Sequence, residues 1–366
     1  MSKNSWANTA RQLGHSVETR FDDLRYSLKK RLKYDQPLQI VPYNGYGNED
    51  SLFIRGRVLE EKGTLNQTSQ ESLWKNLTAA YQRFDSNEVP GLKLIAHFQD
   101  RTFNATTDEE GYFTISVPTP DNLDKTQLWH AIDIEIPPQP MLSAATAPVK
   151  AQVLLPAPDC DFGIISDIDD TIMVTNATSL LAMAQLTFTQ SPATRLPFEG
   201  VAEFYQALTQ GNSASKASRP IFYVSSSPWN LYDFLVEFMQ LNGIPPGPLM
   251  LRDFGMNAEQ VFQSSHHKHK LAQITDVMST YPELAFILIG DSGQYDPEIY
   301  AEIVKARPKQ VKAIYIRDVS QSAQRTDAIR KMANDMGEYG IDMLLVADTK
   351  VAITHASAQG YIDQVH

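Results

Sequence analysis

The sequence predicts an α/β protein in which a parallel β-sheet follows a β-rich domain and an N-terminal amphipathic helix. Three observations support this prediction: a helical apolar stripe at the start, alternating apolar residues in the middle, and apolar runs separated by helical segments at the end. The expected segments are the helix at 1–36, the β-rich domain at 37–157 and the α/β domain at 158–366. A chain of 366 residues is long enough for two domains with separate cores.

The first segment is expected to form a helix over residues 8–33, because apolar residues recur there every three or four positions. These residues are Leu13, Val17, Phe21, Leu24, Leu28 and Leu32. Residues 1–35 carry eight Lys or Arg against four Asp or Glu, whereas the whole chain has a net charge of -11. A basic amphipathic helix suits an anionic membrane surface, and a narrow stripe suits helix pairing. Three partners therefore stay open for this helix: its own protein, a second copy in a homo-oligomer, and a membrane.

The second segment contains short strands with period-two alternation, which favours a β-sandwich. In one of them the apolar residues Ile132 and Ile134 alternate with the acidic residues Asp133 and Glu135. The expected strands are FIRGRVL, LKLIAHF, YFTISV, AIDIEI and VKAQVLL, with one helix near residues 69–84.

The third segment alternates apolar runs with helical stretches, which is the pattern of a buried parallel sheet. The runs are FGIIS, IFYVS, AFILIG, KAIYI and DMLLVA, and the helices are expected near residues 200–210, 229–242, 268–280, 297–306 and 322–336. Ligands of such sheets bind at the carboxyl ends of the strands. Polar residues that directly follow these runs are therefore the candidates for a functional site.

Three aspartates, Asp167, Asp169 and Asp170, follow the first of these runs in the stretch IISDIDDTI. Carboxylates this close repel one another and raise each other's pKa unless a positive group lies near them. If all strands are parallel, the ends of the other strands converge on the same edge of the sheet. The candidates supplied there are Ser225, Ser226, Ser227, one of Lys268 and Lys270, Asp291 and Asp296.

This set of residue types predicts hydrolysis of a phosphate ester. Carboxylate oxygens without histidine or cysteine favour Mg2+, which would also offset the repulsion between the aspartates. An aspartate can attack phosphorus, and a second carboxylic acid two residues later can protonate the leaving oxygen and then activate water. A lysine and a serine can bind the phosphoryl oxygens.

The motifs together resemble those of the haloacid-dehalogenase superfamily: DIDDT for the first, Ser225 for the second, Lys270 for the third, and Asp291 with Asp296 for the fourth. More narrowly, DIDDTI, YVSSSPWNLYDFL, HKLAQI and LIGDSGQYDPEIY resemble the phosphatidate phosphatase family of yeast cortical actin patches and its bacterial relatives. The resemblance covers residues 160–345 and implies a Rossmann-like sheet of haloacid-dehalogenase type. The short segments between the motifs leave no room for a large cap domain.

The resemblance also implies a role for each matched residue. Asp167 would be the nucleophile and a metal ligand, and Asp169 would be the general acid and base, with its backbone carbonyl on the metal. Asp170 stands where many members of the superfamily have glycine, so no role is implied for it. Trp229 is open to two interpretations, packing in the core or contact with a lipid. The remaining implied roles are loop support by Thr171, phosphate binding by Ser225, Ser226 and Lys270, and metal binding by Asp291 and Asp296.

The leading hypothesis is a Mg2+-dependent phosphatase that converts phosphatidate to diacylglycerol and phosphate through an aspartyl-phosphate. Two alternatives stay open: a phosphatase of another phosphomonoester, soluble or on a protein, and a phosphatidate-binding module without catalysis. A phospholipid at a membrane surface is the expected partner, whereas the negative net charge argues against nucleic-acid binding. The N-terminus has no signal-peptide core and the chain has no apolar run of ~20 residues, so we expect a cytoplasmic protein, with peripheral membrane association as an alternative.

Overall fold

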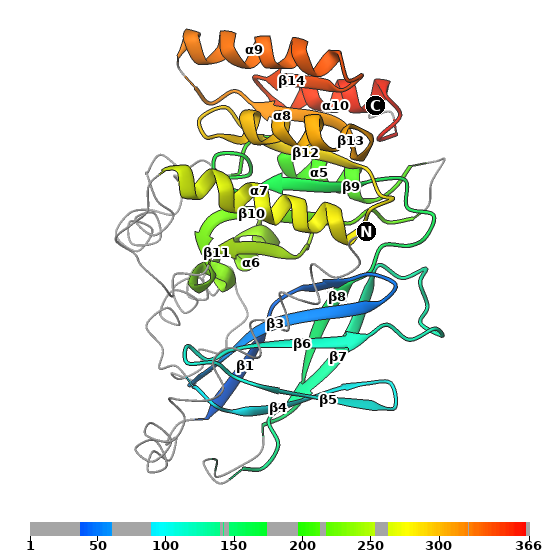
Figure 1. Cartoon of the computed structure of the whole chain (residues 1–366), viewed down its shortest axis with the longest axis vertical. Helices are drawn as coiled ribbons and strands as arrows, with labels where there is room; N and C mark the ends of the chain where they lie inside the picture. The colour runs from blue at the N-terminus through cyan, green and yellow to red at the C-terminus, as the bar shows by residue number, and fades with distance from the viewer. Residues whose placement is uncertain are drawn as a thin grey trace.

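The computed structural model of the chain contains a β-rich domain and an α/β domain (Figure 1). The expected N-terminal helix and the expected helix near residues 69–84 lie outside the described residues. Among the helices that are described, none has both the length and the apolarity needed to cross a bilayer. The residues that the structure describes are 37–60, 89–139, 142, 146–173, 197–212, 217–252, 263–320 and 322–363.

The β-rich domain is a mixed sheet of eight strands. The strands are β1 (Leu38–Pro42), β2 (Gly45–Gly47), β3 (Ser51–Glu60), β4 (Lys93–Phe98), β5 (Arg101–Thr106), β6 (Tyr112–Pro118), β7 (Trp129–Glu135) and β8 (Val149–Leu154). Their order is β1-β3-β2-β8-β7-β4-β5, and β6 pairs with β3. All pairs are antiparallel except that of β2 with β8.

Alternating side chains of these strands build the core of the β-rich domain. In β7 the side chains of Ile132 and Ile134 are buried, whereas those of Ala131 and Asp133 between and beside them are not. The same alternation in the other strands contributes Leu52, Ile54, Leu94, Ile115 and Val153 to one shared cluster. The sequence predicted a β-sandwich. In the structure, the short strand β2 bonds to both β3 and β8 and so joins all eight strands into one mixed sheet.

The α/β domain has a six-stranded sheet, and every pair of neighbouring strands is parallel, as the sequence predicted. Its order is β11-β10-β9-β12-β13-β14. The strands are β9 (Gly163–Asp167), β10 (Ile221–Pro228), β11 (Leu249–Arg252), β12 (Phe286–Asp291), β13 (Val311–Arg317) and β14 (Asp342–Val346).

Helices cover both faces of this parallel sheet (Figure 1). One face packs against α5 (Val201–Thr209), α6 (Tyr232–Leu241) and α10 (Thr349–Ala358), which share a core cluster with it. The other face packs against α7 (Gln263–Thr280), α8 (Asp296–Ala306) and α9 (Ala323–Gly337). With both faces buried, the strands need continuous apolar runs, and this explains why β9 and β12 are buried at every position.

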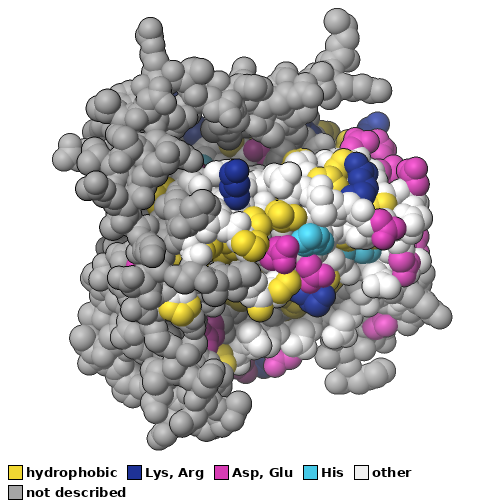
Figure 2. All heavy atoms as spheres, turned by 90° about the horizontal axis from the view of Figure 1, so that it is seen from below, with side chains coloured by type: hydrophobic (Ala, Val, Ile, Leu, Met, Phe, Trp, Pro, Cys, Tyr) yellow, Lys and Arg dark blue, Asp and Glu magenta, His cyan; other side chains and the backbone are white. Residues whose placement is uncertain are grey.

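Figure 2 shows the molecule from the side of the β-rich domain. Acidic, basic and hydrophobic side chains of the described residues are intermixed on this face. Basic patches that bind anionic lipids gather several Lys or Arg side chains in one place. The described part of this face shows no such gathering.

Candidate active site

The site lies at the carboxyl edge of the parallel sheet, where β9 is flanked by β10 and β12. The register aligns Val224 of β10 with Asp167 of β9, so Ser225 begins the polar segment directly beside the first aspartate. On the other side, β12 aligns Ile289 with Ser166 and ends at Asp291. Three separate strand ends therefore deliver their polar residues to one place.

The side chains of Asp167 and Lys270 form the centre of the site. Lys270 projects from α7, and its Nζ lies 2.8 Å from Oδ1 of Asp167. Thr171 donates its hydroxyl to the other oxygen of Asp167, Oδ2, at 3.1 Å. All three side chains are buried, whereas Lys268 on the same helix is exposed. The helix register thus decides the choice that the sequence left open, and Lys270 is the lysine at the carboxylates.

Asp296 links this centre to the end of β12. It lies at the start of α8, forms an ion pair with Lys270, and accepts a hydrogen bond from the backbone N–H of Asp291 at 3.1 Å. A side chain at Gly290 would collide with the carboxylate of Asp296, so glycine is needed for this close approach. Asp291 is fixed in turn, because its Oδ1 accepts the backbone N–H groups of Gly293 at 2.7 Å and Gln294 at 2.9 Å.

Asp169 points to the other neighbouring strand, β10. Ser225 donates its hydroxyl to Oδ2 of Asp169 at 2.8 Å and accepts the backbone N–H of Ser227 at 3.0 Å. The backbone carbonyl of Asp169 faces the other way and accepts Nε2 of Gln294 at 3.4 Å. The carboxyl group of Asp169 is thus held by Ser225, whereas that of Asp167 is held by Lys270 and Thr171.

Burial controls the ionisation of these groups. It raises the pKa of Asp167 well above its ordinary value, against the opposing effect of Lys270. Burial also raises the pKa of Asp169 to about 6, although the hydrogen bond from Ser225 opposes the increase. The pKa of Asp291 rises to about 7 through burial and through the charge of Asp296. Burial would lower the pKa of Lys270, but the two aspartates outweigh it and raise that pKa, so the ammonium stays charged.

Three carboxylates at this site suit a divalent cation. Asp167, Asp291 and Asp296 each offer one oxygen, and these oxygens lie within 4.8 Å of one another. Oδ2 of Asp291 is buried and has no hydrogen-bond partner among the described residues. An unpartnered buried carboxylate oxygen is costly unless a cation or water satisfies it. The oxygen-only donor set fits Mg2+ better than a metal that prefers nitrogen or sulfur.

The structure brings together most, but not all, of the residues that the sequence singled out. Ser226 follows Ser225 on β10 and is only partly buried, with no hydrogen bond that joins it to the site among the described residues. Trp229 is buried, which favours the core interpretation over direct lipid contact. Gln294 links Asp291 to Asp169 and so joins the site residues into one network. The other members of the network are Asp167, Thr171, Ser225, Lys270 and Asp296.

Two supporting residues were missed by the sequence analysis. Arg325 of α9 donates to the carbonyl oxygens of Ser292 at 2.9 Å and Gln294 at 2.6 Å, and it also pairs with Glu298. It therefore fixes the loop whose N–H groups hold Asp291. Arg325 lies more than thirty positions from that aspartate in an ordinary polar helix, so no local pattern marks it.

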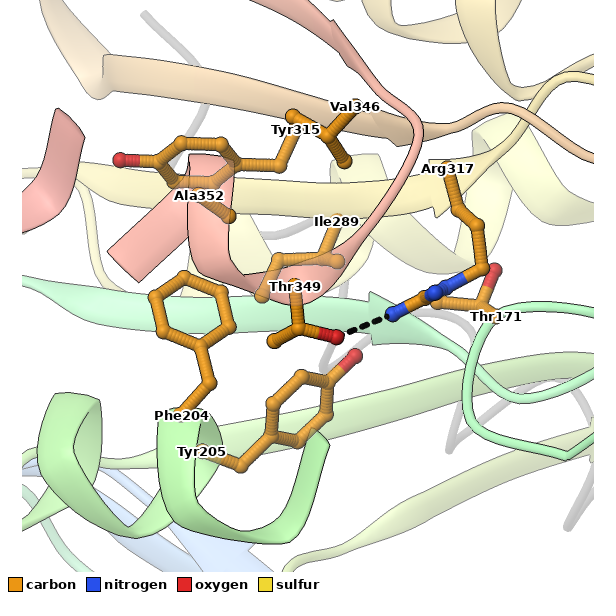
Figure 3. A pocket seen from close by; sticks show the side chains of 9 residues that line it. All are labelled: Thr171, Phe204, Tyr205, Ile289, Tyr315, Arg317, Val346, Thr349 and Ala352. Atoms are coloured by element: carbon orange, nitrogen blue, oxygen red, sulfur yellow. Dashed lines mark hydrogen bonds between the residues drawn. The ribbon is translucent and has the colours of Figure 1, made fainter. Parts of the chain in front are cut away.

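The second missed residue is Tyr205 of α5, which lies behind Asp167. Its hydroxyl lies 2.6 Å from Oγ of Ser166, and Ser166 donates to the backbone carbonyl of Asp167 at 2.7 Å. A small pocket adjoins Tyr205 and Thr171, and Figure 3 shows that Arg317 reaches its edge and donates to the hydroxyl of Thr349 at 2.9 Å. The pocket is lined mainly by apolar side chains.

Asp170 gives a prediction about stability. Its φ is 54°, in the left-handed region that glycine adopts without strain, and this explains why glycine suits the position. Asp170→Val should lower the free energy of unfolding by ~1–2 kcal/mol relative to Asp170→Gly. The reason is that the Cβ atom of any residue other than glycine lies too close to the backbone in the left-handed conformation. Chemical denaturation of both variants checks this difference. Asp170→Asn is the control, since asparagine tolerates positive φ, and a valine variant as stable as the glycine variant would contradict the explanation.

Comparison with known proteins identifies relatives of the α/β domain. Residues 162–318 match the family model for the catalytic domain of phosphatidate phosphatase APP1. The chain is 30% identical over 255 residues to phosphatidate phosphatase APP1 of Saccharomyces cerevisiae, an alignment that covers 67% of this chain and 41% of that protein. It is 27% identical over 250 residues to an uncharacterized protein of Schizosaccharomyces pombe, covering 66% of this chain and 40% of that protein. The chain thus matches less than half the length of either relative.

A solved structure also shows a weak likeness to the chain. The chain is 11% identical to the carbohydrate acetylesterase XAC1771 of Xanthomonas citri, with a TM-score of 0.28. The alignment covers 74% of this chain and 66% of the acetylesterase chain. A score this low does not assign a shared fold. By contrast, every residue of the hydrogen-bonded network lies inside the range matched by the family model. Residues 162–318 of this chain therefore match, by sequence, the catalytic domain of an APP1-like phosphatase.

Proposed function

We propose that the chain is a Mg2+-dependent phosphatase that hydrolyses phosphatidate to diacylglycerol and phosphate through an aspartyl-phosphate. The observation that carries the proposal is the buried cluster of Asp167, Lys270, Asp291 and Asp296, which joins an aspartate nucleophile to a charged lysine and a carboxylate cation site. The sheet order, with the nucleophile at the end of the central strand β9, supports a haloacid-dehalogenase type of fold.

In the first step a carboxylate oxygen of Asp167 attacks phosphorus, and the bond from phosphorus to the ester oxygen breaks. Asp169, as the neutral acid, gives its proton to the leaving alcohol oxygen. A pKa of about 6 leaves part of the population in this protonated form near neutral pH. Lys270 and Ser225 lie beside the reacting carboxyl groups, where they can bind the phosphoryl oxygens. Mg2+ bound at the carboxylates would neutralise part of the phosphoryl charge.

In the second step water hydrolyses the aspartyl-phosphate. Asp169, now ionised, takes a proton from the attacking water, and the acyl–phosphate bond breaks to release phosphate and free Asp167. One residue thus serves first as acid and then as base, so it must hold its position through both steps. The hydrogen bonds from Ser227 to Ser225 and from Ser225 to Asp169 provide that position.

A phosphate-release screen tests the substrate. Phosphatidate in mixed micelles should be hydrolysed faster than soluble phosphomonoesters, and all turnover should need Mg2+. Support for a lipid substrate comes from the yeast relative, which is a phosphatidate phosphatase. A cytoplasmic enzyme with peripheral membrane association is part of the same proposal. Turnover of soluble esters alone would replace phosphatidate with another phosphomonoester. Release from no ester at all would favour a binding module without catalysis.

Removal of metal should abolish the activity and lower the thermal stability. Mg2+ at about 100 times its dissociation constant should stabilise the folded state by ~2.7 kcal/mol, because it binds carboxylates that are close together only after folding. The melting temperature of EDTA-treated protein should therefore rise when Mg2+ is added. In Asp291→Ala this rise should shift to higher Mg2+ concentrations, since a ligand oxygen is lost. Full activity of metal-free enzyme, or an equal melting response of the variant, would argue against the site.

A further inference from the structure

The β-rich domain inserts one short segment, residues 43–47, against the α/β domain next to the candidate active site. The backbone N–H of Asn44 donates to the hydroxyl of Tyr232 at 2.7 Å, and its side chain donates to the carbonyl of Gly247 at 3.4 Å. Tyr43 belongs to the same core cluster as the α/β domain's own buried residues. The first domain thus contributes to the packing of the second instead of standing apart from it.

Tyr43 holds Trp229 by aromatic stacking. The ring centroids are 4.9 Å apart and the rings are inclined by only 9°, while Tyr43 also lies 4.0 Å from the ring of Tyr232. The guanidinium of Arg55, another residue of the β-rich domain, lies 4.6 Å from the Trp229 ring. Nε1 of Trp229 is buried and has no hydrogen-bond partner among the described residues. Stacking and cation–π contacts from the β-rich domain therefore fix this indole.

The position of Trp229 matters because it directly follows the polar segment of β10. Parallel pairing of β10 with β11 is regular to Val224 and resumes only at Pro228, after a shift in register. The segment between these residues carries Ser225 and is not held by a regular ladder on that side. Ser225 donates to Asp169, and the N–H of Ser227 donates to Ser225. A contact that fixes Trp229, at the far end of this segment, therefore also fixes Ser225, the hydrogen-bond partner of Asp169.

We infer that Tyr43 of the β-rich domain is a positioning residue for the Ser225–Trp229 segment, so that the β-rich domain completes the catalytic site. The expected effect of Tyr43 on the rate rests on the proposed phosphatase function, whereas its expected effect on the placement of the segment does not. Tyr43 touches none of the carboxylates; it acts through Trp229 and the serines. The domain is then an integral part of the enzyme and not a detachable adaptor.

A second contact between the domains supplies a matched control. The hydroxyl of Tyr281, on the α7 face of the sheet, donates to the carbonyl of Gly47 at 2.8 Å, and Tyr46 packs edge-on against Phe222 on the same face. These contacts hold the same segment of the β-rich domain, but they do not involve Trp229 or the serines. Tyr281→Phe should therefore weaken the contact between the domains without moving Ser225.

The test compares Tyr43→Leu, Tyr43→Phe and Tyr281→Phe in the full chain. Misplacement of a catalytic group by ~1 Å costs up to about 10²-fold, so kcat of Tyr43→Leu should fall by about 10- to 100-fold with a smaller change in KM. Tyr43→Phe keeps the ring and should restore kcat, and Tyr281→Phe should leave it unchanged. Trp229→Leu removes the stack from the other side and should reproduce the loss. An unchanged kcat in Tyr43→Leu, or an equal loss in Tyr281→Phe, would overturn the inference.

Hydrogen–deuterium exchange tests the positioning without reference to activity. Amide exchange in residues 225–232 should be faster in Tyr43→Leu than in wild type and unchanged in Tyr281→Phe. If wild-type protein hydrolyses no phosphate ester, the proposed function fails while this measurement still decides the role of Tyr43. Equal exchange in wild type and Tyr43→Leu would show that the sheet alone holds the segment and would refute the inference.

Discussion

Asp167→Asn should abolish phosphate release while the fold stays intact. The amide has the shape of the carboxylate and can still accept the hydrogen bond from Thr171, but it has no charge with which to attack phosphorus. Loss of a nucleophile removes the covalent route, and a fall of about 10⁴-fold or more is expected. Lys270 keeps its ion pair with Asp296 in this variant, so the buried ammonium is not left without a partner.

Phosphate release from phosphatidate micelles at saturating Mg2+ measures this effect, and the melting temperature reports on the fold. Asp170→Asn is the matched control, because it makes the same chemical change three residues away, at a position whose positive φ asparagine tolerates. The control should keep its turnover. Near-normal phosphate release by purified Asp167→Asn would contradict the assignment of Asp167 as the nucleophile. A large loss of phosphate release in Asp170→Asn would show that the loop itself had been disturbed.

Asp169→Asn should lower turnover by ~10² to 10⁴-fold, the usual contribution of general acid–base catalysis. Asparagine can accept the hydrogen bond from Ser225, so the local geometry should persist, but it cannot give a proton to the leaving oxygen or take one from water. The loss should depend on the leaving group. An ester of an acidic phenol needs little protonation on leaving, so formation of the aspartyl-phosphate should suffer less with it than with an alkyl phosphate.

The two steps can be separated in the Asp169→Asn variant. With the phosphate ester of the acidic phenol, the phenol should appear in a burst equal to the amount of enzyme. Slow release of phosphate should follow, because hydrolysis of the aspartyl-phosphate still lacks its base. Wild-type enzyme should release both products together. Equal losses with both esters and no burst would assign the acid–base role to a group other than Asp169, and an unchanged rate would exclude this residue from the chemistry.

The sequence alone located most elements of the α/β domain, although not α10, and it located the carboxylates that meet at the site. Its apolar runs are long because both faces of the parallel sheet are buried, and the residues after β9, β10 and β12 had to meet because parallel strands end at one edge. Such rules are local, so a linear pattern records them. The short strands β1, β2 and β5 were missed because their formation depends on neighbours in the sheet rather than on a periodic pattern.

Only the tertiary structure decided the features that depend on distant parts of the chain. The register of α7 selected Lys270 over Lys268, and the packing of α9 brought Arg325 to the loop of Asp291. Sequence spacing offered no way to pair Tyr43 with Trp229, which are 186 positions apart and belong to different domains. Contacts of this kind depend on how secondary-structure elements pack, because the two side chains come together only after both elements have formed. Most residues that meet at the candidate site were therefore readable from the sequence, whereas the residues that hold them in place were not.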